Sequence, residues 1–290
     1  MKTTNILVTG ANGQLGKSLK LISEQYKNFS FHFKSKEQLS ILNNEDISEF
    51  IVANAIDLLI NCAAYTNVEK AEEEKEKAFS INVDGVENLG KVAKAHHIKL
   101  IHISTDFVFD GNAGIPYIET AKVNPLNVYG LSKYKGENAL LNLQYKNILI
   151  IRTSWLFSQF GNNFVKTILK LATQKKKLSV VSNQYGSPTY AVDLAEAILN
   201  LIPMWPADIY GIYHFANKGV CSWFEFADEI IKLNGLKCEV NKILDTDFKT
   251  KAIRPKYSAL NTEKMEKTFQ LKIRHWKDGL KDCLKNIEYN

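Results

Sequence analysis

The chain has 290 residues, of which 45% are hydrophobic and 23% are charged, and its net charge at pH 7 is +6. These are the values of an ordinary globular protein, and the mild positive charge does not indicate a nucleic-acid-binding protein. The four cysteines show neither close pairing nor metal-site spacing, so we expect reduced thiols and no bound metal. No apolar run reaches the roughly 18 residues of a membrane span, and Gly10 ends the short apolar run that follows the N-terminus. A cytoplasmic protein without membrane contact is therefore expected.

Short apolar runs and longer helical patterns alternate through the first half of the chain. Strands are predicted at 6–8, 29–33, 58–60, 100–103 and 148–151, and helices at 15–23, 45–53, 78–95 and 128–143. Near-continuous apolar strands separated by helices are typical of a parallel sheet that is covered on both faces. The pattern predicts an α/β fold with a doubly wound, Rossmann-like parallel sheet.

The second half of the chain is less regular. A helix at 164–172 and a strand at 178–181 are followed by a helix at 191–201 and a strand at 212–215, which are expected to rejoin the parallel sheet. The rest predicts a smaller α+β part. We therefore expect a dinucleotide-binding domain at 1–152, with returning segments at about 190–216, interleaved with a C-terminal substrate-binding cap at 153–189 and 217–290.

A glycine-rich turn joins the first predicted strand to the first predicted helix. Gly10 permits a sharp turn, Gly13 permits close approach of a pyrophosphate, and Gly16 permits packing of the helix on its strand. Free N–H groups at the helix start can bind phosphate. A dinucleotide site is predicted here, with contacts from Gly10, Asn12, Gly13, Gln14, Leu15 and Gly16.

A second cofactor contact is predicted at the end of the third strand, where ligands of open α/β sheets bind. The residues are Ala63, Ala64, Tyr65 and Thr66. Simple packing of small side chains explains the same residues equally well. After the second strand, Lys34 and Lys36 replace the usual acidic residue and could meet a 2′-phosphate, which favours NADPH over NADH.

Tyr129 and Lys133 are one turn apart on the predicted helix 128–143 and share a face. An ammonium group near a phenol lowers the pKa of the phenol from about 10, and such a phenol can protonate a carbonyl oxygen as a hydride reaches its carbon. A chance pair of surface side chains is the alternative, because this spacing is common.

Ser104, Thr105 and Asp106 follow the predicted strand 100–103 at its carboxyl end, where a hydroxyl can point into a cleft. A hydroxyl there can hold the same substrate oxygen for Tyr129. A turn or helix cap is the alternative use of these residue types. The glycine turn, the hydroxyl run and the downstream tyrosine together favour catalysis by hydride transfer.

With these motifs the chain resembles the dTDP-4-dehydrorhamnose reductase family of extended short-chain dehydrogenase/reductases, from residue 1 to about 285. The resemblance rests on the strings AYTNVEKAE (64–72), PLNVYG (125–130), RTSW (152–155), GNNF (161–164), NQYGSPT (183–189) and DLA (193–195), with Arg254-Pro255-x-x-Ser258. These strings are specific together and unspecific singly.

The resemblance implies reduction of the C4 ketone of dTDP-4-dehydro-L-rhamnose to dTDP-L-rhamnose with NADPH or NADH. It implies that Tyr129 donates the proton, Lys133 binds the nicotinamide ribose and Thr105 contacts the substrate oxygen. The substrate residues that it implies are Ser104, Thr105, Asp106, Trp155, Asn163, Gln184 and Arg254. An indole face suits a deoxysugar, and a guanidinium suits a diphosphate, although a surface arginine explains Arg254 nearly as well.

Departures from the family pattern concern four positions. Ser18 stands where some relatives carry a carboxylate near a bridging Mg²⁺, which leaves metal-linked dimerisation in doubt, and a homodimer stays possible. Ser40 stands where relatives can have Asp near the cofactor, which weakens any inference about NADPH against NADH. Glu69 and Phe107 replace the frequent Asp and Tyr of the family, and both changes are mild. Two other functions remain open: a non-catalytic subunit like the β-subunit of methionine adenosyltransferase, and a reductase or epimerase for another nucleotide sugar.

Overall fold

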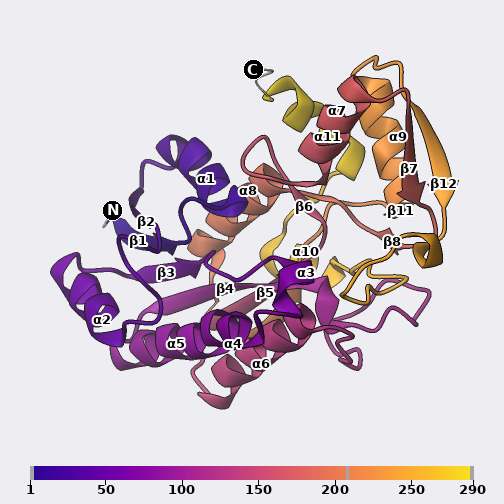
Figure 1. Ribbon diagram of the computed structural model, residues 1–290. Coiled ribbons are helices and arrows are strands. Elements are labelled where there is room, and N and C mark those ends of the chain that lie inside the picture. Colours follow the sequence, from indigo (N-terminus) through magenta and orange to yellow (C-terminus); the bar gives the residue numbers. More distant parts are fainter. Residues whose placement is uncertain (1–2, 207–208, 288–290) are drawn as a thin grey trace.

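The computed structural model describes residues 3–206 and 209–287, and its centre is a parallel sheet (Figure 1). The strands are β1 (Thr4–Thr9), β2 (Phe29–Lys34), β3 (Leu58–Asn61), β4 (Lys99–Thr105), β5 (Ile148–Thr153) and β10 (Gly211–His214). Their spatial order is β10-β5-β4-β3-β1-β2, and every neighbouring pair is parallel. The strand order reverses between β1 and β3, which is where doubly wound sheets bind ligands.

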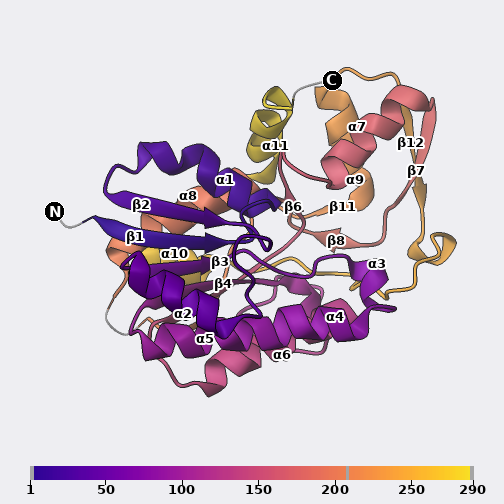
Figure 2. The same ribbon diagram turned by 60° about the vertical axis from the view of Figure 1, so that its left-hand side comes forward.

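Helices cover both faces of this sheet (Figure 2). The two sets are α1 (Gln14–Ile22) with α8 (Ala191–Leu201), and α2 (Asn44–Ala53) with α5 (Gly85–Ala95) and α6 (Val128–Asn142). Alternate side chains of β1 separate the two cores: Ile6 and Val8 belong to the first and Leu7 to the second. Burial of both faces explains why these strands are apolar throughout, and the predicted doubly wound fold is confirmed.

One predicted helix is interrupted. The segment expected as a single helix at 78–95 consists of α4 (Lys75–Phe79), a π-helical turn (Ser80–Asp84) and α5. The side chain of Asn82 in that turn donates hydrogen bonds to the backbone oxygen of Tyr65 and to Ser132 on α6. A Cβ atom on Gly136 would lie 2.1 Å from the backbone oxygen of Asn82. The wider turn therefore lets the chain contact α6 closely, which hydrophobic periodicity cannot reveal.

The second part of the molecule has its own core. It contains α7 (Phe164–Gln174), β7 (Lys177–Val181), α9 (Trp223–Leu233), β12 (Glu239–Ile243) and α11 (Trp276–Lys285). β7 and β12 form a parallel pair. Two further pairs of short strands are present: β6 (Leu156–Phe157) pairs with β9 (Thr189–Tyr190), and β8 (Tyr185–Gly186) with β11 (Cys221–Ser222). The short α3 (Val68–Ala71) follows β3.

Helix α10 (Glu263–Phe269) does not lie in the second core. Its Met265 and Phe269 pack in the core of the parallel sheet, and the predicted cap range 217–290 thus contains a helix that covers the sheet. The predicted return of 212–215 to the sheet is confirmed by pairing of β10 with β5. The domain limits themselves stay a prediction, and their residues 1–2, 207–208 and 288–290 lie outside the described residues. No helix in the described ranges is long and apolar enough to cross a membrane.

Candidate active site

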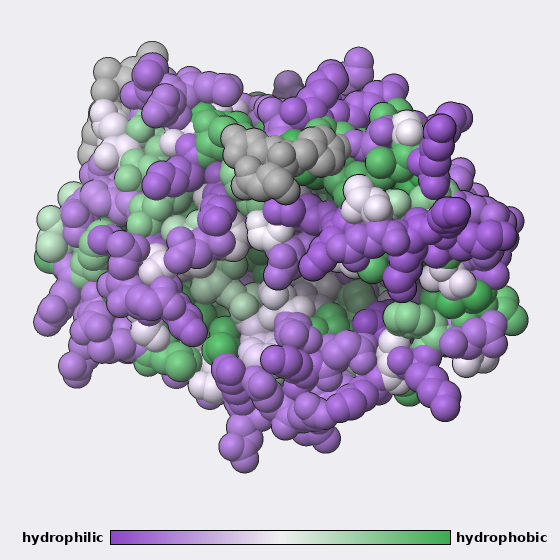
Figure 3. Space-filling model, turned by 45° about the horizontal axis from the view of Figure 1, so that its top comes forward, coloured by the Kyte–Doolittle hydropathy of each residue, from purple (hydrophilic) through white to green (hydrophobic). Residues whose placement is uncertain are grey.

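A cavity of about 840 Å³ opens where the carboxyl ends of β1, β3 and β4 meet the second part of the molecule. Figure 3 shows the molecule hollowed near the middle of one face, with hydrophilic side chains around the hollow. The volume is within the range of small-molecule and cofactor sites. The cavity is where the sequence predicted cofactor and substrate, because both the glycine turn and the hydroxyl run end in it.

The glycine turn forms one wall. Gly10 has φ +68°, in the left-handed region, and a Cβ atom there would lie 2.5 Å from the backbone nitrogen of Ala63. A side chain at Gly10 would therefore collide with the end of β3. Within the described part of the chain, no side chain caps α1 at Gly13. The N–H groups at this start of α1 therefore have no side-chain acceptor among the described residues and face the cavity that Gly13, Gln14 and Leu15 line. This start of α1 fits the diphosphate of a dinucleotide.

Most predicted cofactor residues line the cavity, namely Gly10, Asn12, Gly13, Gln14, Leu15, Ala63, Ala64 and Thr66. Two do not. Gly16 lies behind the turn, where a Cβ atom would be 2.6 Å from the backbone oxygen of Gly10, so its role is packing. Tyr65 turns away, since its ring packs with Ala71 and Ala78 and its hydroxyl donates to Glu74.

The loop after β2 forms the adjoining wall. Lys36 lines the cavity and its side chain is exposed, whereas the Lys34 ammonium lies 4.7 Å from the centre of the Phe50 ring. Only one of the two lysines expected near a 2′-phosphate is therefore placed for that contact. Glu37 also lines this wall and accepts a hydrogen bond from Ser35.

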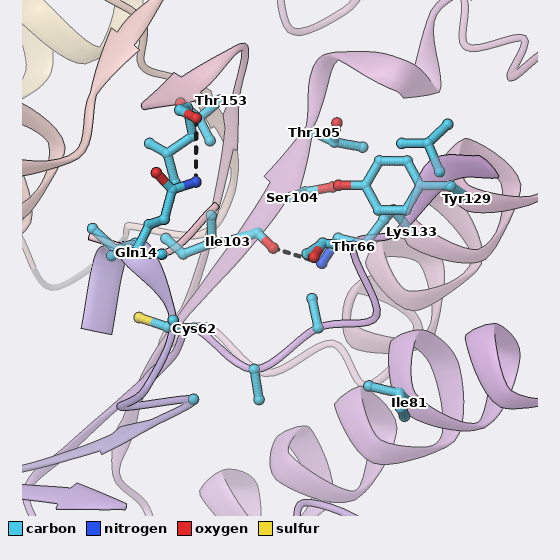
Figure 4. A pocket seen from close by; sticks show the side chains of 18 of the residues that line it. Gln14, Cys62, Thr66, Ile81, Ile103, Ser104, Thr105, Tyr129, Lys133 and Thr153 are labelled. Carbon is cyan, nitrogen blue, oxygen red and sulfur yellow. Dashed lines mark hydrogen bonds between the residues drawn. The ribbon is translucent and has the colours of Figure 1, made fainter. Parts of the chain in front are cut away.

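Thr105, Tyr129 and Lys133 meet in the cavity (Figure 4). Thr105 ends β4, while Tyr129 and Lys133 lie one turn apart on α6, which Asn127 caps by accepting from the Gly130 N–H. Burial raises the pKa of the Tyr129 phenol to about 12, opposed by a hydrogen bond with Thr105 and reinforced by the charge of Asp106. The Tyr129 pKa is therefore raised, whereas a lowering by Lys133 was expected, because burial dominates. The phenol keeps its proton at neutral pH.

Ser104 lines the cavity as expected, but its hydroxyl is engaged by a buried carboxylate. Its hydroxyl donates to Glu137 Oε1 at 2.5 Å, and Arg152 holds the same carboxylate at 2.9 and 2.6 Å. The Arg152–Glu137 pair is about 1% exposed or less. Ser104 and Thr105 both line the cavity, and Thr105 is the one whose hydroxyl bonds to Tyr129. Ser104 anchors β4 to a buried ion pair.

Asp106 lies beside Thr105 and accepts its hydroxyl at 3.1 Å. Burial raises the pKa of the Asp106 carboxyl to about 7, although hydrogen bonds from Ser258 and Thr105 oppose the shift. The carboxyl is therefore protonated in slightly acidic solution and ionised in slightly alkaline solution. It can donate or accept a hydrogen bond toward a substrate near neutral pH.

Trp155 forms part of the far wall in an unusual backbone conformation, with φ +47°. Its ring stacks on Trp223 with centroids 3.4 Å apart and planes at 4°. Gly186 lies against this ring, since a Cβ atom there would be 2.5 Å from Trp155 Cε2. A bulky non-glycine residue with positive φ is costly and occurs mainly where the surroundings impose it, often at functional sites. Both indoles line the cavity, and they give it apolar surface that suits a deoxysugar.

The remaining predicted substrate residues are placed differently. Asn163 lines the cavity, but its amide donates to Gln14 Oε1 at 2.9 Å and its oxygen caps α7. Gln14 and Asn163 thus tie the first helix to the second part of the molecule. Gln184 is buried outside the cavity wall. Arg254 lines the cavity, with its guanidinium 2.6 Å from the Glu69 carboxylate.

Sequence reasoning missed Trp223, Asn61 and His102. The Ser222-x-x-Glu225 pattern, which forms a capping box in the structure, was the available signal that Trp223 opens a helix. Asn61 directly follows the predicted strand 58–60 and His102 lies within the predicted strand 100–103, and neither was assigned a role. Among the residues that the structure describes, no group of three or more metal-ligating side chains is found.

Comparison with known proteins agrees with this geometry. The family model described as "RmlD substrate binding domain" matches residues 4–289. The chain is 40% identical to a dTDP-4-dehydrorhamnose reductase of Aggregatibacter actinomycetemcomitans over 96% of this chain and 97% of that one. It is 37% identical to the Escherichia coli K12 protein of the same name over 98% of both.

A solved structure shows the same likeness in three dimensions. The dTDP-4-dehydrorhamnose reductase of Bacillus anthracis, solved in complex with NADP, superposes with a TM-score of 0.92 at 38% identity and covers 98% of this chain and 99% of that one. The resemblance expected from the motifs is confirmed. The chain belongs to the dTDP-4-dehydrorhamnose reductase family.

Proposed function

We propose that this protein reduces the C4 ketone of dTDP-4-dehydro-L-rhamnose to dTDP-L-rhamnose, with NADPH as the hydride donor. The observation that carries the proposal is the meeting of Thr105 and Tyr129 in one cavity with the uncapped start of α1. Relatives at 37–40% identity bear the name of this activity, and one relative was solved with NADP.

The dinucleotide would lie along the glycine turn, with its diphosphate at the N–H groups of α1 and its adenosine end beside Lys36. When bound, it supplies a hydride to the ketone carbon. Tyr129 supplies the proton to the ketone oxygen, and its raised pKa of about 12 keeps that proton in place until the oxygen becomes basic. Thr105 donates a hydrogen bond to the same oxygen and fixes its position relative to the phenol.

The sugar would lie between this corner and the indole wall of Trp155 and Trp223, within reach of Asp106. Arg254 would meet the diphosphate of the substrate by exchanging its contact with Glu69 for phosphate oxygens. We propose that the cap segments 153–189 and 217–290 supply the nucleotide contacts. A homodimer also stays a prediction, and light scattering of the purified protein tests it by measuring the molecular mass in solution.

The test follows NADPH and NADH oxidation with dTDP-4-dehydro-L-rhamnose, generated enzymatically, and identifies the product by mass spectrometry and NMR. We expect cofactor oxidation that depends on the sugar, and an equimolar yield of dTDP-L-rhamnose. Other nucleotide-linked 4-keto sugars serve as competitors. Faster turnover of another sugar would reassign the substrate, and no oxidation with any of them would contradict the proposed reaction.

A further inference from the structure

A row of buried polar side chains runs across the sheet beneath the reacting centre. Thr9, Asn61 and His102 occupy paired positions on β1, β3 and β4, and Lys133 of α6 ends the row. All four side chains are at most 1% exposed. Their contacts are Thr9 Oγ1 to Asn61 Oδ1 at 2.7 Å, Asn61 Nδ2 to His102 Nδ1 at 2.9 Å and His102 Nε2 to Lys133 Nζ at 3.2 Å. Buried polar rows of this kind require every donor to meet an acceptor.

The direction of the Asn61 amide is set by the backbone. The Ala63 N–H, which can only donate, lies 3.0 Å from Asn61 Oδ1. The oxygen of the amide must therefore face Ala63 and Thr9, and its NH₂ group must face His102. Since an amide NH₂ cannot accept, His102 Nδ1 has to be the acceptor and carries no proton.

The remaining proton of the imidazole then lies on Nε2. Burial and the charge of Lys133 hold the pKa of His102 well below its ordinary value, so the ring is neutral and has one N–H. That N–H points at Lys133 Nζ. The lysine also donates to the backbone oxygen of Ile103 at 2.7 Å. An ammonium would place two donors face to face, whereas a neutral amine accepts from His102.

We propose that Asn61 locks His102 as the Nε2–H tautomer, and that His102 is thereby a positioning residue that favours the uncharged amine of Lys133 in the cofactor-free protein. The consequence for turnover rests on the proposed role of Lys133 in the reductase. The His102 N–H opposes the charged form of the lysine. His102 thereby sets the upper pH limit at which Lys133 serves as a cation.

The other titratable groups that face Lys133 do not remove this effect. Burial lowers the pKa of Lys133 to about 8, while Glu137 on the same helix and Cys62 after β3 act in the opposite direction. The Cys62 thiol, with its pKa raised by burial to about 12, is neutral in the relevant range. The Tyr129 phenol is neutral as well, and Glu137 is paired with Arg152. Glu137 is thus the ionised group that opposes the effect of the His102 N–H, and its carboxylate is already held by Arg152.

The direct test is the tautomer itself. Protein labelled with ¹⁵N-histidine is studied by long-range ¹H–¹⁵N correlation from about pH 6 to pH 9, a range that spans ordinary histidine titration. The signals of His102 are assigned by their loss in His102→Gln. We expect a protonated Nε2 and an acceptor-type Nδ1 throughout. A protonated Nδ1 in the wild-type protein would overturn the proposal, whatever the variants do.

The kinetic test uses Asn61→Asp, in which the new carboxylate accepts from Nδ1–H and flips the tautomer. The Nε2 lone pair then accepts from the ammonium, so we expect the alkaline limb of the kcat/KM profile with NADPH to rise by about one pH unit or more, equivalent to a tenfold change in the lysine equilibrium. Thr9→Val is the matched control, because Ala63 still directs the Asn61 amide. Its tautomer and alkaline limb should match the wild type.

Two substitutions of His102 test whether a donor to Lys133 is what matters. In His102→Gln the Nε2–H₂ group can still donate to Lys133, whereas the side chain of His102→Leu cannot donate. We expect the alkaline limb of His102→Gln to match the wild type and that of His102→Leu to move upward. If Asn61→Asp is folded and the alkaline limb of its kcat/KM profile does not move, the inference is contradicted. If Lys133→Met retains full turnover while the tautomer is as assigned, the catalytic role of Lys133 fails and the tautomer lock stands.

Discussion

The hydroxyl groups of Ser104 and Thr105, neighbours on β4, bond to different partners. Ser104 donates to the buried Glu137 carboxylate at 2.5 Å, and Thr105 donates to Asp106 beside Tyr129 at 3.1 Å. One hydroxyl therefore supports the sheet and the other serves the cavity. This division separates effects on stability from effects on turnover.

Thr105→Val and Ser104→Ala should separate those effects. We expect Thr105→Val to lower kcat by about 100-fold, because one donor to the reacting oxygen is lost. It should lower the unfolding free energy by only about 0.5–1 kcal/mol, because the Phe107 N–H loses its cap. Ser104→Ala should instead lower the unfolding free energy by about 1–3 kcal/mol, because Glu137 loses a partner, and keep kcat close to the wild type. Urea unfolding and steady-state kinetics measure both, and an interchange of the two phenotypes would refute the assignment.

Tyr129→Phe should lower kcat by about 100-fold or more, because the ring keeps its packing and loses the proton that the ketone oxygen needs. The Phe107 ring, whose centroid is 5.6 Å away, should keep the new ring in place. NADPH binding, followed by fluorescence, should change little. Wild-type turnover in the folded variant would remove Tyr129 from the mechanism.

Asp106 should give substrate binding a pH dependence. Its pKa is raised to about 7 by burial, so the carboxyl is neutral below that pH and anionic above it. An anion in the cavity repels the diphosphate of the substrate, and we expect KM for the nucleotide sugar to rise as pH passes 7. Asp106→Asn cannot ionise and should show a flat KM across the same range. Equal pH profiles for the two proteins would contradict this role.

The Arg152–Glu137 pair should be essential for stability. Removal of one member leaves the other charge buried without a partner, and we expect Arg152→Met to lower the unfolding free energy by about 3–5 kcal/mol. The double variant Arg152→Met/Glu137→Leu should lose less, because no buried charge remains. Urea denaturation of the wild type and the two variants measures the difference. A lower unfolding free energy in the double variant than in Arg152→Met would contradict this explanation.

Lys36 should contribute to cofactor choice. It lines the cavity, whereas Lys34 lies on the Phe50 ring. We expect Lys36→Ala to raise KM for NADPH by about 3- to 5-fold and to leave KM for NADH unchanged, the size expected for an exposed ionic contact. Lys34→Ala is the matched control and should keep the wild-type ratio of the two constants. Equal effects of both substitutions would place the 2′-phosphate elsewhere.

Features that depend on near neighbours in the chain were determined by the sequence. The apolar strands, the glycine turn at Gly10 and the one-turn spacing of Tyr129 and Lys133 follow from local periodicity and backbone freedom, and the structure contains all three. The break at Asn82 is different, because its side chain bonds to Ser132, 50 residues away. Periodicity within the segment carries no trace of that contact.

Features that depend on distant partners were decided only by the tertiary structure. The stacking of Trp155 on Trp223, the ion pair of Arg254 with Glu69 and the contact of Asn61 with His102 each join residues that are far apart in the chain. The Tyr129 pKa moved opposite to expectation, because burial outweighs a nearby cation that points elsewhere. Desolvation and donor direction arise from packing, and packing is absent from a linear pattern of residues.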